Sequence, residues 1–254
     1  MGRFEANSIA WGKDNVTQWL LLGGAAFLAS TLAAVAGFGG AAVLLPALVA
    51  VFGVRDAIPI LTVAQLIGNG SRVWFNRREV ALPVVGWFAL GAVPLALAGG
   101  VLFATAPLGA LKRVIGAFLL LMVLWRRLPG APVWRPTARA FAGLGALFSF
   151  ISALTGSVGP FMAPFFLAYG LVKGAYIGTE ALATVVMHVV KLGAYAGMAI
   201  LTGRAAVAGL ALGPIMIAGS YVGKRILDRL PEKVFVVIIE LVLVGAGGLF
   251  LLGR

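Results

Sequence analysis

The sequence contains no cysteine and few charged residues. The lack of cysteine excludes disulfide bonds, thiolate metal sites and a cysteine relay acting on a substrate sulfur. Charged residues make up only 11% of the 254 residues, whereas 61% are hydrophobic and the mean hydropathy is +1.05. A soluble domain carries about 25% charged residues. The composition therefore predicts a single integral membrane domain over residues 1–254, in contact with the lipid bilayer.

Acidic residues are also scarce, since 8 Asp and Glu stand against 20 Lys and Arg, for a net charge of +12. In a soluble protein this excess would suggest nucleic-acid binding. Here the basic residues cluster in short loops between apolar runs, as cytoplasmic loops do. We therefore expect no nucleic-acid partner. The chain also lacks a nucleotide-binding P-loop and a signal-peptide pattern, so we expect a retained first helix and no ATP-driven chemistry.

Ten apolar segments recur along the chain. They cover residues 16–36, 41–53, 57–76, 82–103, 113–126, 140–155, 160–171, 175–200, 205–222 and 234–252. A full membrane span needs about 20 residues. The second and seventh segments are shorter, and each follows a glycine-rich break, GFGG at Gly37–Gly40 or GSVG at Gly156–Gly159. These two segments are expected to be half-helices or re-entrant segments.

The two glycine breaks belong to an internal duplication. Gly37 corresponds to Gly156 and Gly53 to Gly170, so we divide the chain into repeat 1 (16–126), a basic linker (126–139) and repeat 2 (140–252). Five segments per repeat is an odd number, so the copies should be inverted. The predicted fold class is an all-α membrane protein with two inverted five-segment repeats. Placing the basic linker in the cytoplasm puts both termini outside a cell inner membrane.

Two matched polar stripes run along the third and eighth segments. At a constant offset of 119 residues, the first stripe maps onto the second: Gln65 onto Thr184, Asn69 onto His188, Arg72 onto Lys191, and Asn76 onto Tyr195. Each stripe lies on one helix face. Single polar residues in membrane helices often make interhelical hydrogen bonds, and Arg72 alone could snorkel to the membrane surface. Two matched stripes are better explained by a lined path.

The charges of this path predict its passenger. In inverted copies, Arg72 lies toward the cytoplasm and Lys191 toward the outside, so a cation would be repelled at both places and a small anionic substrate is expected. The half-helix N-termini at the glycine breaks would add N–H donors, although glycines there could equally serve helix packing. The candidate binding residues at the breaks are Gly37, Gly39, Gly40, Ser157 and Gly159.

Glu180 and His188 are the candidate groups for proton coupling. His188 could accept a proton, donate a hydrogen bond to substrate, or be a packed side chain. Helical rise puts Glu180 nearly level with Arg72. Glu180 either pairs with Arg72 in the absence of substrate or only hydrogen-bonds groups near the start of its own helix.

The motifs resemble those of the sulfite exporter TauE/SafE family. They comprise G-x-G-G at Gly37–Gly40 followed by Pro46, RREV after the third segment, GPFMAP at Gly159–Pro164, GTEAL at Gly178–Leu182, and Lys191. The chain departs from the family pattern at Pro59-Ile60, where a Gly-Thr pair is common. The resemblance implies a transporter of sulfite, sulfoacetate or related sulfonates across the cytoplasmic membrane.

The sequence thus favours a secondary transporter that works by alternating access, with no enzyme activity, no cofactor and no metal. A homodimer is compatible with it. Two rivals stay open. A passive anion channel would use the same path. An intramembrane serine hydrolase would use Ser157 with His188, but GSVG matches no known nucleophile motif.

Overall fold

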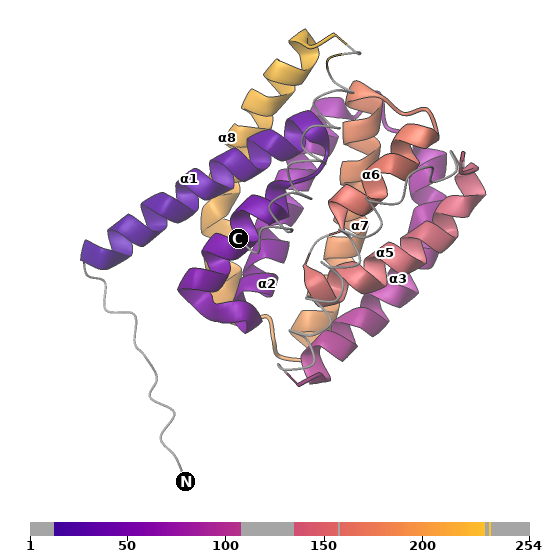
Figure 1. Ribbon diagram of the computed structural model, residues 1–254. Coiled ribbons are helices and arrows are strands. Elements are labelled where there is room, and N and C mark those ends of the chain that lie inside the picture. The colour runs from indigo at the N-terminus through magenta and orange to yellow at the C-terminus, as the bar shows by residue number, and fades with distance from the viewer. Residues whose placement is uncertain (1–12, 108–134, 157, 232–233, 235–254) are drawn as a thin grey trace, which may run out of the picture.

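The computed structural model describes residues 13–107, 135–156, 158–231 and 234, and every regular element within them is a helix (Figure 1). In chain order these are α1 (Lys13–Ala36), α2 (Gly40–Asn76), α3 (Leu82–Thr105), the short 3-10 helix η1 (Ala138–Ala140), α5 (Phe141–Thr155), α6 (Gly159–Ala168), α7 (Lys173–Gly197) and α8 (Gly203–Arg229). Segment 113–126, nearly all of segment 234–252, most of the linker and both termini lie outside the described residues. The all-helical class is confirmed.

Five of the described helices are long and apolar enough to cross a membrane: Val16–Ala36, Leu82–Thr105, Ala138–Thr155, Lys173–Gly197 and Gly203–Arg229. Two apolar helices are too short to cross, Val43–Gly53 and Gly159–Ala168, at the places where the sequence predicts short segments. The second part of α2 is not among the five, because it carries the first polar stripe. These lengths describe a multi-pass membrane protein.

Most helix boundaries lie within about three residues of the predicted ones, and the two larger differences are in α2 and α8. The second and third segments form one element, α2, with a kink at Gly53, where the backbone has φ 75° and ψ 165°. Glycine tolerates this conformation, so the chain turns there without a separate loop. Helix α8 also runs to Arg229 instead of ending at residue 222. Its last turns are polar, and an ion pair between Lys224 and Asp228 at 2.6 Å, one turn apart, favours helix there.

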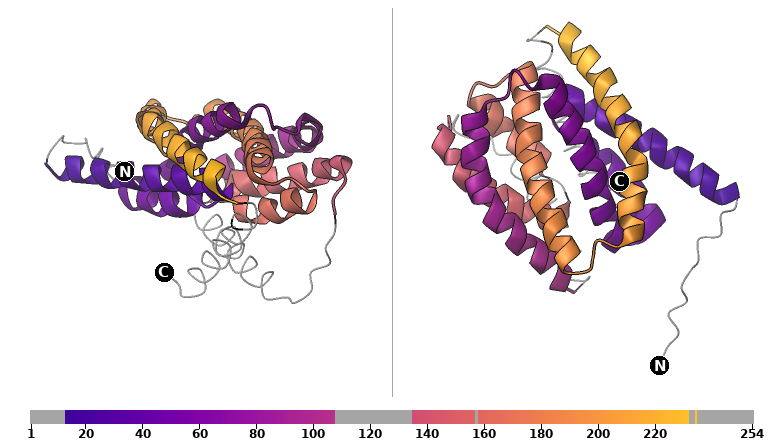
Figure 2. Two further views of the ribbon diagram at one scale, coloured as in Figure 1. Left: turned by 90° about the horizontal axis from the view of Figure 1, so that it is seen from above. Right: turned by 180° about the vertical axis from the view of Figure 1, so that it is seen from behind.

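Helices of the first half of the chain pack in pairs against helices of the second half. Helix α1 lies against α8 and α3 against α5, while α2 and α7 run between these pairs (Figures 1 and 2). Glycines allow the close approach: a Cβ at Gly219 would lie 2.6 Å from the Phe27 carbonyl oxygen, and one at Gly91 would overlap the Ala142 carbonyl. Small residues at such crossings are typical of membrane helices.

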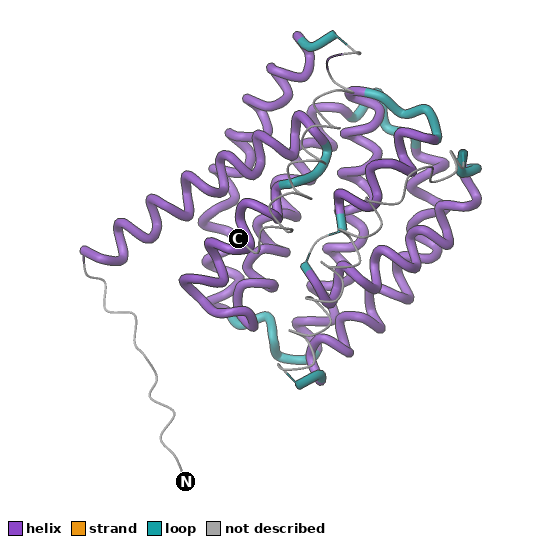
Figure 3. The backbone as a smooth tube through the Cα atoms, in the orientation of Figure 1, coloured by secondary structure: helices purple, strands orange, loops and turns teal. Residues whose placement is uncertain are grey.

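The two glycine breaks lie inside this bundle. Figure 3 shows them as loop segments between helix ends in the middle of the molecule. Gly37–Gly40 is buried throughout, as are Gly156 and Val158. The breaks also approach each other, because a Cβ on Gly159 would lie 2.7 Å from that of Phe38. Helices α2 and α7 pack beside them and carry the two polar stripes to the same region.

Candidate functional site

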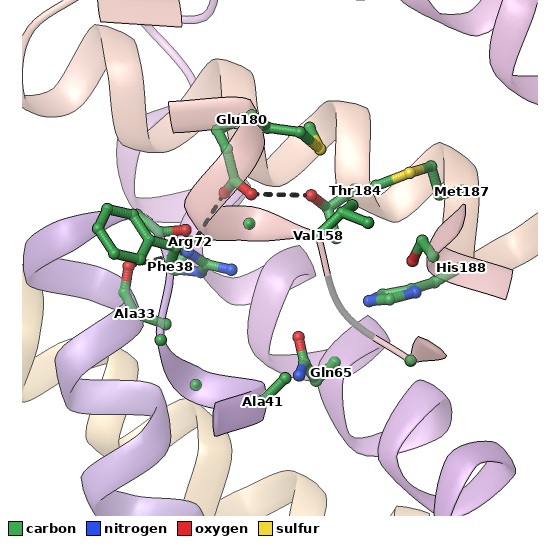
Figure 4. Close-up of a pocket in the computed structure, with 17 residues that line it drawn as sticks. Ala33, Phe38, Ala41, Gln65, Arg72, Val158, Glu180, Thr184, Met187 and His188 are labelled. Carbon is green, nitrogen blue, oxygen red and sulfur yellow. Dashed lines mark hydrogen bonds and ion pairs between the residues drawn. The ribbon is translucent and has the colours of Figure 1, made fainter. Parts of the chain in front are cut away.

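A small cavity lies between the two glycine breaks (Figure 4). Its volume is about 30 Å³, which is room for about one water molecule. Residues from α1, α2, α5, α6, α7 and both breaks line it. They are Ala33, Gly37, Phe38, Gly39, Gly40, Ala41, Gln65, Arg72, Ser152, Gly156, Val158, Gly159, Met162, Glu180, Thr184, Met187 and His188. The cavity thus collects polar groups from both halves of the chain.

The two breaks have matching backbone geometry where the preceding helix ends. Gly37 follows α1 with φ 84°, and Gly156 follows α5 with φ 83°. This left-handed conformation ends a helix and is readily available to glycine only. A new helix begins within four residues in each case, α2 at Gly40 and α6 at Gly159. The first N–H groups of both helices therefore border the cavity.

Arg72 is buried and fully engaged with the protein. Its side chain is 5% exposed. Nη1 donates to the carbonyl oxygens of Ala33 at 2.8 Å and Gly37 at 3.0 Å, at the end of α1, and Nη2 donates to Oδ1 of Asn69. A side chain snorkelling to the surface would be exposed, so the snorkelling interpretation is wrong. A positive charge at a helix C-terminus is also favoured by the helix dipole.

Glu180 forms an ion pair with Arg72, which is one of the two alternatives that the sequence left open. Its Oε2 lies 3.5 Å from Arg72 Nη1, and its Oε1 accepts a hydrogen bond from the Thr184 hydroxyl at 3.0 Å (Figure 4). Both charged side chains are almost fully buried, at 5% and 3% exposed. The pair reduces the cost of holding either charge away from water.

Lys191 occupies the position equivalent to Arg72 and makes an equivalent contact. It is fully buried, and its Nζ donates to the Ser152 hydroxyl at 3.1 Å and to the Ser152 carbonyl at 3.4 Å. Ser152 lies 119 residues after Ala33, the carbonyl partner of Arg72. Each basic side chain thus binds a carbonyl near the end of the first long helix of its own half. Lys191 does not line the cavity itself and reaches it through Ser152.

Several buried nitrogens around the cavity have no hydrogen-bond partner among the described residues. They are Nε2 of Gln65, Nδ2 of Asn69, and both ring nitrogens of His188. Buried polar groups normally find partners. Figure 4 shows the side chains of Gln65 and His188 pointing toward the space between the breaks. Amide nitrogens only donate, and a neutral imidazole has one donor, so this wall offers N–H groups to a ligand.

Nearly all of the predicted site residues fall at this cavity. Asn69 contacts the lining residue Arg72, and Lys191 contacts the lining residue Ser152, but neither lines the cavity itself. Ser157 lies outside the described residues. Sequence reasoning missed Ser152, Met162 and Met187 as lining residues. No sequence signal identified Ser152, because its counterpart Ala33 is an apolar residue that contributes only a backbone carbonyl. Among the described residues, no group of three His, Asp or Glu side chains could hold a metal ion.

The fold and the site define a class of protein. A multi-pass helical membrane protein with a cavity between its two halves, lined by an ion pair and by N–H donors, has the architecture of a membrane transport protein. The model of the family described as Sulfite exporter TauE/SafE matches residues 22–250, nearly the whole chain, and the protein belongs to that family. No curated protein and no solved structure matches it.

Proposed function

We propose that the protein is a secondary transporter that moves sulfite, sulfoacetate or a related sulfonate across the cytoplasmic membrane by alternating access. One observation carries this proposal: N–H donors of Gln65 and His188, which have no partner among the described residues, converge with Arg72 on a cavity. Such donors match the oxygens of a tetrahedral sulfur oxyanion. Charge-assisted hydrogen bonds to an anion are also about twice as strong as neutral ones.

The helix ends at the breaks support an anionic passenger. Helix α2 begins at Gly40 and α6 at Gly159, and both of these residues line the cavity. Free N–H groups and the positive end of the helix dipole favour anions at such a place. The packing interpretation holds at the same residues, since Gly159 lies against Phe38. Close packing and anion binding are compatible here, because only a small residue leaves the N–H groups accessible.

The matched contacts of the two halves support inverted repeats. Arg72 with Ala33 repeats as Lys191 with Ser152, and the left-handed glycine at Gly37 repeats at Gly156. The packing of α1 with α8 and of α3 with α5 is also what two interlocked copies of one unit would produce. Two inverted units can rock about a site between them, which is the basis of alternating access.

The size of the cavity favours a transporter over a passive channel. The cavity between the described residues has a volume of about 30 Å³, smaller than a sulfonate, so we expect the surrounding helices to move apart when the anion binds. A gated movement of this kind is inherent to alternating access, whereas a channel needs a continuous open path. The serine hydrolase alternative depends on Ser157, which lies outside the described residues.

The ion pair between Arg72 and Glu180 suggests how transport is coupled to protons. Arg72 is the positive group in the cavity wall nearest to Glu180, at 3.5 Å. An entering anion that carries two negative charges competes with the carboxylate for the guanidinium. Glu180 is then released from its partner and can take up a proton, which would travel with the anion.

Ligand-dependent stability tests the proposal. We expect sulfite or sulfonates to raise the melting temperature of the purified protein in detergent, because a ligand at a hundred times its Kd stabilises the folded state by about 2.7 kcal/mol. The screen should include sulfate, thiosulfate, taurine, sulfoacetate and carboxylates of similar size. Stabilisation by carboxylates alone would refute the sulfur-anion proposal. A rate of uptake into vesicles that rises in proportion to the substrate concentration, without saturation, would favour a channel.

A further inference from the structure

The charged side chains of the cavity wall determine which charges of a transported anion the site can balance, and this inference rests on the proposed function. Two ionic side chains line the cavity, Arg72 and Glu180, and they form an ion pair with each other. Behind the wall stands Lys191, fully buried and held by Ser152. Within the described residues, Glu180 is the one carboxylate in the lining.

Each carboxylate oxygen of Glu180 already contacts one partner, so neither oxygen has a further described partner to offset additional negative charge nearby. One of its oxygens lies against Arg72 at 3.5 Å and the other accepts from Thr184 at 3.0 Å. With 3% of its surface exposed, the carboxylate is also shielded from water. Repulsion between like charges is far stronger in such a site than in water.

The net charge of the occupied site therefore depends on the charge of the transported anion. A monoanion adds one negative charge to a neutral Arg72–Glu180 pair, with Lys191 close by to balance it. A dianion adds a second negative charge that no described cavity group compensates. A proton on Glu180 removes this excess, because it leaves Arg72 free to face the ligand.

We propose that Glu180 adjusts the number of protons bound together with the transported anion to the charge of that anion. A monoanionic sulfonate binds while Glu180 stays ionised and paired with Arg72, whereas a dianionic sulfur oxyanion binds together with one additional proton, taken from solution onto Glu180. Glu180 thus adjusts the net charge of the site to the charge of the anion. One carrier can accept both classes of anion in this way, each with the same total charge in the membrane.

Other titratable groups face the same region and are the competing proton sites. His188 points into the cavity from α7 and has both ring nitrogens unpartnered among the described residues. Tyr176, also on α7, lies against Gly37, and Lys191 is held by Ser152 of α5. The first stripe on α2 contributes only Arg72 as a charged group. Glu180 is distinguished from these by its direct contact with Arg72, the positive group of the cavity lining that a dianion would engage.

A pair of ligands of nearly the same shape tests the proposal on the full-length protein in detergent. Methanesulfonate is a monoanion and thiosulfate is a dianion, with a sulfur in place of the methyl group, and neither titrates between about pH 6 and about pH 8. Titration calorimetry in buffers of different ionisation heat counts the protons taken up on binding. We expect the binding of thiosulfate to take up about one proton more than the binding of methanesulfonate. As the pH rises, the affinity for thiosulfate should therefore fall by roughly a further tenfold per pH unit relative to the affinity for methanesulfonate.

The variant Glu180→Gln should remove the difference between the ligands, so that thiosulfate binds with no more protons than methanesulfonate. Asp228→Asn, which changes an exposed carboxylate of α8 far along the chain from the stripes, should keep the difference. The pH dependence of the unmodified protein tests the proton difference even if Glu180→Gln does not fold.

The outcomes separate this inference from the proposed function. If neither ligand nor sulfite binds, the proposed function fails. Equal proton uptake for the two ligands, or binding of methanesulfonate but never of thiosulfate, refutes only the charge-matching role. A proton difference that persists in Glu180→Gln and disappears in His188→Gln would assign the proton to His188 and likewise overturn the inference.

Discussion

Replacing the two matched glycines by alanine should have unequal effects on stability. Gly37 and Gly156 share nearly the same left-handed backbone, with φ 84° and 83°. An alanine in this region costs about 1–2 kcal/mol at either position. The surroundings differ. A Cβ at Gly37 would overlap the ring of Tyr176, whereas one at Gly156 would meet its nearest neighbour, Leu61, at an ordinary 3.5 Å.

The difference between the variants follows from this overlap. Tyr176 is fully buried, so its ring cannot move aside freely, and overpacking of a buried site costs about 1–3 kcal/mol. Gly37→Ala should therefore lower the free energy of unfolding by about 2–5 kcal/mol, and Gly156→Ala by about 1–2 kcal/mol. Unfolding by denaturing detergent in mixed micelles, followed by far-UV circular dichroism, measures both.

A double-mutant cycle isolates the contact with Tyr176. In a Tyr176→Ala background the overlap is gone, and Gly37→Ala should then cost no more than the backbone strain of about 1–2 kcal/mol. Equal destabilisation by Gly37→Ala and Gly156→Ala in the original protein, or an unchanged cost of Gly37→Ala without the Tyr176 ring, would refute the reasoning.

Three further changes follow from the structure. Lys191→Met should leave the protein folded, since apolar replacement of a buried charge is often neutral, but weaken anion binding by about 2 kcal/mol or more; unchanged affinity would make Lys191 purely structural. Arg72→Gln should impair transport from the cytoplasmic side more than from the outside in vesicles of known orientation, and equal small effects would argue against a role on the path. Gly91→Ala should separate α3 from α5, because its Cβ would overlap the Ala142 carbonyl, and should lower the melting temperature, while Gly86→Ala, with open space around it, should not.

The membrane class and the helix breaks could be predicted from the sequence because they depend on local properties. Hydrophobic content and segment length determine which helices can span a bilayer. Glycine is favoured where φ is positive, so Gly37, Gly156 and Gly170 marked helix ends and Gly53 marked the kink inside α2.

The ion pair of Arg72 with Glu180 was one of two alternatives from the sequence, and it followed from helical rise together with the proposed inverted repeat. The two side chains were expected at the same level, and the structure places them 3.5 Å apart. The extent of α8 was underestimated, since an apolar window ignores the pair of Lys224 and Asp228 that continues the helix into polar residues.

The partners of the buried charges were decided only by the tertiary structure. Nothing in the sequence shows that Arg72 binds the carbonyls of Ala33 and Gly37, or that Lys191 binds Ser152, because each contact joins residues at least 35 positions apart on different helices. A carbonyl is present at every residue and carries no sequence signal. Which carbonyls a guanidinium or an ammonium reaches depends on how closely the helices pack, and the glycines at their crossings set that distance.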